Sequence, residues 1–408
     1  MWLTFAFAST AALVTHGVAR RVGVTSSLVG DENEYVWRSH QTDPFQPTPF
    51  LRMPLFPAVG RLAALGRLDP ARWLAATCAL ASIVTVGLAA SAARLLGGPV
   101  AAAIATAFLL LALERHVFAR RRWPDPLLGC WTTALFLGLV ADWPPLAIGA
   151  VLAIAAATRV DALVMLPAAI VSIAVNDVSL SGVITILVVP IVTVAAITVS
   201  NGVRYHLWLP DTTFRFNVGL ASAEARLMTQ STSERVSAAV RRWDPAQGRL
   251  EPVDEATRPK ALDFLRGLRR RSVTLIGPDV FVREHLLTAA PSRSATVSLS
   301  IAAPTIIVLT VATAGRLTDA YSALLPVAAL VITQAAFHTS TRFRHSFLPV
   351  LGCLSAVGVV RTIERPDVDF VDLFAFCAGL TTFFVIVGGS LRLQRLRANL
   401  NPPEGHPS

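Results

Sequence analysis

Long apolar segments recur through this chain of 408 residues, and they constrain its fold more than any other feature. A helix needs roughly 20 mostly apolar residues to cross a hydrocarbon core of about 30 Å, because each residue adds about 1.5 Å. The chain offers such segments at 2–19, 72–96, 98–114, 126–142, 145–158, 161–177, 181–201, 294–314, 318–337, 346–361 and 370–391. A mean hydropathy of +0.57 and a charged fraction of 15% exclude an ordinary soluble domain. The pattern predicts an all-α integral membrane protein with about 11 transmembrane helices.

Two hydrophilic stretches are too long to be simple turns. The first, 20–71, mixes prolines with apolar residues, which predicts short interfacial helices along the bilayer surface. The second is rich in arginine and predicts a mostly helical external loop or small cap, with helical runs near 222–242 and 259–271. We therefore divide the chain into an N-terminal transmembrane module at 1–201 that includes a catalytic loop at 20–71, the external loop at 202–293, C-terminal transmembrane helices at 294–391 and a polar tail at 392–408.

The sequence lacks the motifs of several functional classes. The four cysteines all fall in apolar segments, so they indicate packing residues and no disulfide framework or zinc site. The second stretch contains no nucleotide-binding glycine loop, no HExxH and no Cys/His metal spacing. The net charge of +10 comes without any nucleic-acid motif, so anionic membrane lipid is the expected partner.

The acidic motif Asp31-Glu32-Asn33-Glu34-Tyr35 follows the first apolar segment. A carboxylate pair at the mouth of a membrane protein can take a proton, hold a divalent cation or lie solvated in a loop. Tyr35 fits either an interfacial anchor or a substrate contact.

Two further polar clusters lie at segment ends. Arg120, Arg121 and Arg122 precede Asp125, and guanidinium groups bind phosphate in bidentate geometry, although arginines at helix ends also anchor many membrane proteins. Arg159 and Asp161 interrupt an apolar region. They belong either to a tight turn at the surface or to an inward turn that faces a lipid phosphate.

Three short segments resemble one family, the GT-C membrane glycosyltransferases, in particular the branch of protein O-mannosyltransferases and lipid A aminoarabinose transferases. Asp31-Glu32-Asn33-Glu34-Tyr35 is similar to the Asp-Glu-x-x-Tyr pattern of their first external loop, with the proline-flanked segment Arg52–Pro57 after it. Arg122–Leu128 looks like their second external loop. Arg342–Pro349 is similar to their late Arg-Tyr-x-x-x-Pro segment, with phenylalanine in place of tyrosine.

The resemblance implies transfer of a sugar from a polyprenyl-phosphate carrier to a glycan, lipid or protein acceptor at the external membrane face. Asp31 is the expected base for the acceptor hydroxyl, and Glu32 and Asp125 are expected either to orient it or to coordinate Mg²⁺ or Mn²⁺, so the cofactor stays open. The expected ligands of the donor phosphate are Arg120, Arg121, Arg122, Arg159, Arg342 and Arg344. The expected substrate contacts are Tyr35, Arg52 and His345.

Two other functions stay open at this point. In a secondary transporter the acids would carry coupling ions, and a non-catalytic membrane scaffold of the same fold would need none of them. With the N-terminus inside, most of the arginine-rich loops fall outside, which opposes the positive-inside tendency. The alanine-, valine- and arginine-rich composition favours a multi-pass protein of a prokaryotic plasma membrane.

Overall fold

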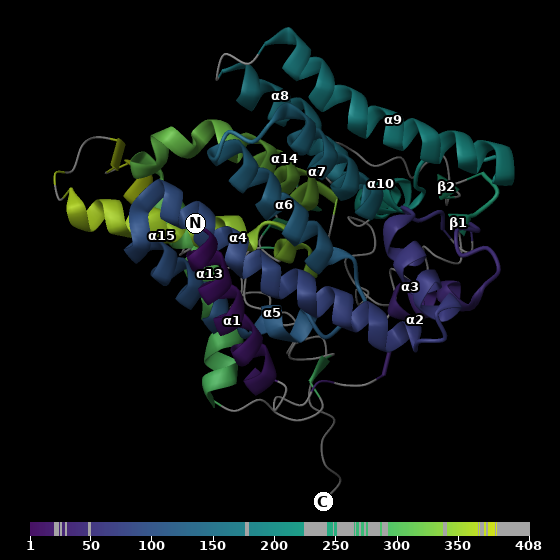
Figure 1. Cartoon of the computed structure of the whole chain (residues 1–408), viewed down its shortest axis with the longest axis horizontal. Helices are drawn as coiled ribbons and strands as arrows, with labels where there is room; N and C mark the ends of the chain where they lie inside the picture. Colours follow the sequence, from purple (N-terminus) through teal and green to yellow (C-terminus); the bar gives the residue numbers. More distant parts are fainter. Residues whose placement is uncertain are drawn as a thin grey trace, which may run out of the picture.

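The computed structural model of the chain is a bundle of helices of very different lengths (Figure 1). It describes residues 1–19, 24, 27–28, 31–47, 50–175, 179–223, 243–247, 249–250, 286–287, 293–337 and 341–365, with isolated positions in 265–275 and 367–381. Within these residues the only paired strands are β1 (Trp243–Asp244) and β2 (Arg249–Leu250), which form a small antiparallel hairpin.

Four helices of the described chain have the length and apolar composition to cross a bilayer. They are α1 (Trp2–Ala19), α4 (Pro70–Leu111), α9 (Leu180–Tyr205) and the continuous stretch Ala314–Phe337, in which the 3₁₀ helix η5 (Ala314–Ala320) leads into α14 (Tyr321–Phe337). Shorter apolar helices are α6 (Asp125–Val140), α7 (Pro145–Thr158), η1 (Val160–Val164) with α8 (Met165–Ala174), and α13 (Arg293–Ala312). The expected count of about 11 spans stays a prediction, and 370–391 lies largely outside the described residues.

The core forms around α4, which packs against α1, α6 and α15 (Leu348–Glu364). Small side chains on α4 let these neighbours approach closely, because helices in a membrane associate mainly through van der Waals packing. Ala89, Ala90 and Ala93 are fully buried, and Val357 of α15 belongs to the same cluster.

Helix α4 bends where its sequence reads Gly97-Gly98-Pro99. Both glycines have non-helical dihedral angles, and Gly98 lies at φ 75° and ψ −171°, a region that is essentially restricted to glycine. The bend falls between the two apolar segments expected at 72–96 and 98–114. Each half of α4 therefore corresponds to one expected segment.

The first hydrophilic stretch contains the two short helices α2 (Asp31–His40) and α3 (Leu55–Leu65). Helix α3 is amphipathic: Phe56 and Ala63 are buried, whereas Leu62 and Leu65 are 67% and 64% exposed. Exposed leucines on a short helix beside membrane-length helices fit the interface between bilayer and water.

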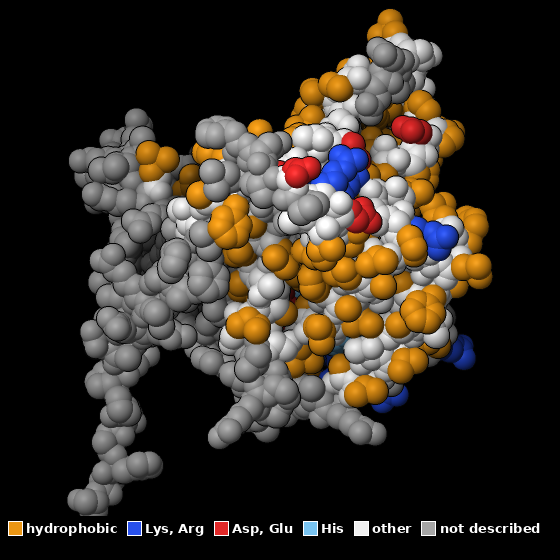
Figure 2. Space-filling model, turned by 90° about the vertical axis from the view of Figure 1, so that its left-hand side faces the viewer, with side chains coloured by type: hydrophobic (Ala, Val, Ile, Leu, Met, Phe, Trp, Pro, Cys, Tyr) orange, Lys and Arg blue, Asp and Glu red, His pale blue; other side chains and the backbone are white. Residues whose placement is uncertain are grey.

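The surface is consistent with a membrane environment. On the face in Figure 2, most of the side chains that are coloured by type are apolar, and only a few are charged. Helix α9 contributes many exposed apolar residues, among them Ile191, Val199 and Val203. An apolar exterior of this kind is stable only against lipid or another apolar surface.

The second hydrophilic stretch is described only in part. It begins with α10 (Thr213–Ala223) and includes the hairpin β1–β2. Most of the helical runs expected at 222–242 and 259–271 lies outside the described residues.

Replacing Gly98 by alanine should lower the free energy of unfolding by about 1–3 kcal/mol, because a side chain is strained at this backbone conformation. No atom lies within 4 Å of the added Cβ, so the loss comes from the backbone alone. Reversible unfolding in mixed detergent and SDS micelles measures it. Gly17→Ala in α1 is the matched control, since its Cβ also meets nothing within 4 Å. Equal stability of the two variants would contradict a bend that requires glycine at position 98.

Candidate functional site

The loop after α2 is held by one buried guanidinium. Arg38 is 0% exposed and donates hydrogen bonds to the carbonyl oxygens of Pro44 (3.1 Å), Gln46 (2.7 Å) and Phe50 (2.5 Å). Its charge is balanced by Glu34, one turn earlier, at 2.7 Å. A proline-rich loop has few N–H donors of its own, so a guanidinium that gathers its carbonyl oxygens fixes its path.

The two hydrophilic stretches are joined directly behind this loop. The backbone N–H of Leu51 donates to the Thr212 hydroxyl at 2.9 Å, and the N–H of Thr212 donates to the Leu51 carbonyl at 3.2 Å. Arg52 follows Leu51 and Asp211 precedes Thr212, so this pairing brings Arg52 and Asp211 into the same region. Asp211 also caps α10, because its Oδ1 accepts the N–H of Phe214 at 3.0 Å.

Asp31 lies between two arginines at the start of α2. Arg342 donates to its Oδ2 at 2.8 Å, and the Arg52 Nη2 is 3.4 Å from its Oδ1. Burial raises the pKa of this carboxyl. The charges of Arg52 and Arg342 and the hydrogen bond from Arg342 lower the pKa by more than burial raises it, so it lies well below its usual range. The carboxylate is therefore ionised at physiological pH, and its side chain remains 33% exposed.

Arg342 also lies near a second arginine, Arg159, with the Phe343 ring in contact with both. The guanidinium groups of Arg342 and Arg159 lie 4.8 Å and 4.9 Å from the centre of the Phe343 ring, so this phenylalanine separates two cations. Arg159 pairs with Asp161 at 3.0 Å and with Asp125 at 3.3 Å. The turn after α7 thus points inward, because the Arg159 side chain is only 14% exposed.

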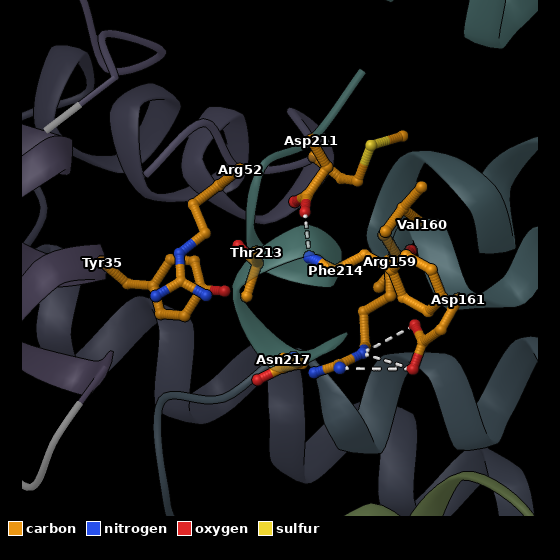
Figure 3. A pocket seen from close by; sticks show the side chains of 11 residues that line it. Tyr35, Arg52, Arg159, Val160, Asp161, Asp211, Thr213, Phe214 and Asn217 are labelled. Atoms are coloured by element: carbon orange, nitrogen blue, oxygen red, sulfur yellow. Dashed lines mark hydrogen bonds and ion pairs between the residues drawn. The ribbon is translucent and has the colours of Figure 1, made fainter. Parts of the chain in front are cut away.

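Arg52, Arg159 and Asp161 of these groups line a polar cavity (Figure 3). Tyr35 and Arg52 stand on one side and Arg159 with Asp161 on the other, with Thr213 and Asn217 between them. The cavity leaves about 30 Å³ for the centres of water-sized spheres and about 330 Å³ of empty space when its open mouth is included. Its lining consists of Tyr35, Arg52, Met53, Thr158, Arg159, Val160, Asp161, Asp211, Thr213, Phe214 and Asn217.

Tyr35 and Asp211 of the cavity have raised pKa values. Burial raises the pKa of Tyr35 to about 12, so its hydroxyl stays protonated and can donate a hydrogen bond. Burial also raises the pKa of Asp211, against the lowering effect of Arg52. Asp31 and Asp211 are therefore two carboxyl groups near one arginine whose environments shift their pKa values in opposite directions.

Glu32 and Asp31 have different partners. It is fully buried, forms an ion pair with Arg121, which is also fully buried, and accepts the backbone N–H of Arg122 at 2.7 Å. The Arg122 Nε donates a hydrogen bond to the Ala71 carbonyl oxygen at 3.3 Å, and Arg120 is half-buried on the same turn. None of these residues lines the cavity. In this structure the Arg120–Arg122 turn joins α2 to α4 and α6.

Arg344 and His345 also point away from the cavity. Arg344 is fully buried and pairs with Glu114 of α5 (Leu113–Phe118). The His345 ring stacks on Phe118 with centroids 4.2 Å apart, and burial, with the charges of Arg344 and Arg115, holds its pKa well below the usual value. The ring is therefore neutral. From the late segment, only Arg342 reaches Asp31.

The carboxylates do not fit a metal site as they are arranged. Asp31 faces two guanidinium groups, and both oxygens of Glu32 have partners. Asp125 accepts from Arg159 through Oδ1, while its buried Oδ2 has no partner among the described residues. No group of three or more His, Cys, Asp or Glu in the described part of the chain is placed to hold an ion.

Sequence reasoning missed several residues of this site. Asp211 carried a signal, because an acid before Thr212-Thr213 and an apolar run is typical of a helix N-cap. The Glu34–Arg38 pair has the i,i+4 spacing of a helical ion pair. Asn217 carried no signal, since one half-buried amide in α10 has no distinctive pattern.

No protein-family model and no curated protein sequence matches the chain. Among solved structures it is similar to the oligosaccharyltransferase AglB of Archaeoglobus fulgidus in complex with an inhibitory peptide and a dolichol-phosphate, at 13% identity and a TM-score of 0.48 over 98% of this chain and 56% of that one. A form of the same enzyme tethered to an acceptor peptide gives the same identity and TM-score over 100% of this chain. ArnT from Cupriavidus metallidurans bound to undecaprenyl phosphate is similar at 16% identity and a TM-score of 0.38, over 89% of this chain and 78% of that one.

Both of these proteins are GT-C glycosyltransferases, the class that the sequence motifs resemble. The chain spans about half the length of the archaeal enzyme. With identities of 13–16% and TM-scores of 0.38–0.48, the activity of this chain has to be inferred from its own side chains.

Replacing Glu32 by glutamine should destabilise the protein by about 3–5 kcal/mol, because it leaves the buried Arg121 charge unpaired. Thermal unfolding of the detergent-solubilised protein measures the loss. Arg72→Gln is the matched control: it breaks the Arg72–Asp69 pair, whose side chains are 89% and 51% exposed, and should cost no more than about 1 kcal/mol. A Glu32 variant as stable as this control would show that the buried pair contributes little.

Proposed function

We propose that the chain is an integral membrane glycosyltransferase that moves a sugar from a polyprenyl-phosphate carrier to an acceptor hydroxyl. The observation that carries this proposal is the ionised Asp31 carboxylate held between Arg342 and Arg52 beside a polar cavity. The cavity lies at the end of the apolar helix α7 and beside α2 and α10, where a lipid-linked donor and an acceptor can meet. The one site provides a base for a hydroxyl and cations for a phosphate.

The reaction follows from these groups. The acceptor oxygen attacks the anomeric carbon of the sugar, the bond from that carbon to the phosphate oxygen breaks, and the acceptor proton passes to the Asp31 carboxylate. The leaving polyprenyl phosphate takes the bonding electron pair. Arg342, Arg52 and Arg159 are the guanidinium groups placed to stabilise its growing charge, since they are part-exposed at the cavity or beside Asp31.

Donor binding would also activate the base. A phosphate and the Asp31 carboxylate would compete for the same guanidinium hydrogens, because Arg342 and Arg52 both contact Asp31. When the phosphate takes one of them, Asp31 loses a cationic partner and its pKa rises. The carboxylate thus becomes a better proton acceptor only when a donor is in place.

The remaining cavity residues fit a hydroxylated ring. Tyr35 and Thr213 offer hydroxyl groups and Asn217 offers an amide, while Asp211 supplies a buried carboxyl group. No side-chain hydrogen bond occupies Asn217 within the described residues. Polar groups of this kind around a small cavity select among sugars through their hydroxyl positions.

The membrane arrangement is part of the same proposal. About 11 spans would place Asp31, Asp125 and Arg159 on one face, and we assign this to the external face of a prokaryotic plasma membrane. The alternative of a secondary transporter is less favoured, because Asp31 and Asp125 stand at the first residues of α2 and α6 and not at mid-helix. A non-catalytic scaffold would tolerate the loss of Asp31.

The Asp31→Asn variant should lose about 10²–10⁴-fold of its transfer activity, since asparagine keeps the shape but cannot take the proton. Release of undecaprenyl phosphate from a panel of undecaprenyl-phosphate-linked monosaccharides, with a bacterial membrane extract as the source of acceptors, measures the loss. Asp69→Asn is the control, because Asp69 is an exposed carboxylate at the start of α4 and asparagine caps a helix equally well. Full activity of the Asp31 variant would reject Asp31 as the base and favour the scaffold or the transporter.

The pH dependence of transfer should show no acid limb from Asp31 near neutral pH, because its pKa is held below the usual range. In Arg342→Gln one of the cations that lowers this pKa is gone, so the acid limb should move to higher pH. The stabilisation from these ion pairs is present above the unfolded-state pKa of about 3.9 and is lost as the pH falls through the lower folded-state pKa. Activity and thermal unfolding measured from acid to neutral pH test both statements, and identical acid limbs in the two proteins would refute the assigned pairing.

A further inference from the structure

A second cavity lies between α3, the loop after α2 and the last turn of α9. It provides about 480 Å³ for the centres of water-sized spheres and is open to the outside. Arg61 and Arg204 line it together with the apolar side chains of Phe45, Ala58 and Leu62. It shares no lining residue with the cavity beside Asp31.

The charge in this groove is positive and available. Among the described residues no side chain or carbonyl oxygen pairs with the Arg61 guanidinium. Arg204 is 54% exposed, lies 4.0 Å from Asp43 and also contacts the Tyr205 hydroxyl. Both oxygens of Asp43 are already used, since Oδ1 accepts the Phe45 N–H at 3.0 Å and Oδ2 accepts the Tyr205 hydroxyl at 2.5 Å. Asp43, which also lines the groove, thus fixes the loop against α9, while the Arg61 guanidinium and the exposed part of the Arg204 guanidinium face the groove.

The residues around the groove have the composition of a membrane interface. Helix α9 exposes Val192, Val199 and Val203 along its length and ends at Tyr205. Trp208 follows with 62% exposure, as is typical of side chains at the membrane interface. On the other side of the groove, Leu62 is 67% exposed. An acyl chain that packs along α9 would bring its phosphate to Arg204 and Arg61.

We propose that this groove binds an anionic glycerophospholipid, with its phosphodiester between Arg61 and Arg204 and its acyl chains against the exposed apolar side chains of α9 and Leu62. Two guanidinium groups match the oxygens of one phosphodiester, and the apolar wall has no role for a free phosphate. The ligand is a lipid of the bilayer and not the sugar donor, because the groove is separate from the Asp31 cavity. The inference holds whether or not the proposed glycosyl transfer is correct.

Native mass spectrometry of the full-length protein in detergent tests the proposal by titration with phosphatidylglycerol, phosphatidylcholine or inorganic phosphate. The wild type should retain phosphatidylglycerol in preference to phosphatidylcholine. The Arg61→Ala/Arg204→Ala double variant should bind phosphatidylglycerol about 25-fold more weakly, at about fivefold for each guanidinium. Arg61→Lys/Arg204→Lys keeps the charges and should lose less, because lysine cannot bind in bidentate geometry.

Arg72→Ala is the matched control, since Arg72 is 89% exposed, lies near α3 in the sequence and does not line the groove. Equal weakening by Arg72→Ala would overturn the site in favour of general surface charge. Unchanged affinity in the double alanine variant would also overturn it. Displacement of phosphatidylglycerol by equimolar inorganic phosphate would assign the groove to free phosphate and reject the lipid.

Discussion

A charge that is buried at the end of a membrane bundle needs an opposite charge, and this requirement organises the polar end of the molecule. The contact between Asp31 and Arg342 meets it across the whole chain, joining α2 to the segment before α15. In the same way, Arg159 forms ion pairs with Asp125 and Asp161, and Arg52 forms an ion pair with Glu34. Since each acid has a guanidinium partner, segments with no backbone hydrogen bonds in common are held in one place.

The arginines of this end fall into two groups that differ in exposure. Arg38, Arg121 and Arg344 are all 0% exposed, and their donors are directed at carbonyl oxygens or at one buried acid. Arg52, Arg159 and Arg342 are 7%, 14% and 17% exposed, and each borders the cavity or Asp31. Exchanging one carboxylate partner for a phosphate requires access to solvent. The first group can therefore maintain the frame while the second changes partners.

The sequence was sufficient to predict the helical class and the short helices after the first apolar segment, because apolar runs and prolines act locally. It was also sufficient to select Asp31, Arg52, Arg159 and Arg342, which the structure brings together. It could not predict that Glu32 pairs with Arg121, since neighbours on a helix point in different directions and only the fold decides which one meets Arg121. Asp211 joins Arg52 through the pairing of Leu51 with Thr212, 161 residues apart, which no local pattern contains.

The Asp31–Arg342 contact spans 311 residues, and this separation has a consequence for how the chain is made. At a synthesis rate of about 5–20 residues per second, Asp31 emerges roughly 15–60 s before its partner exists. During that interval the carboxylate has only Arg52 of its own hydrophilic stretch as a cationic partner, and the stretch has only its internal contacts, such as those of Arg38. The ion pair between α2 and the segment before α15 thus forms late, so a chain stopped before Arg342 holds the Asp31 carboxylate with one of its two cationic partners missing.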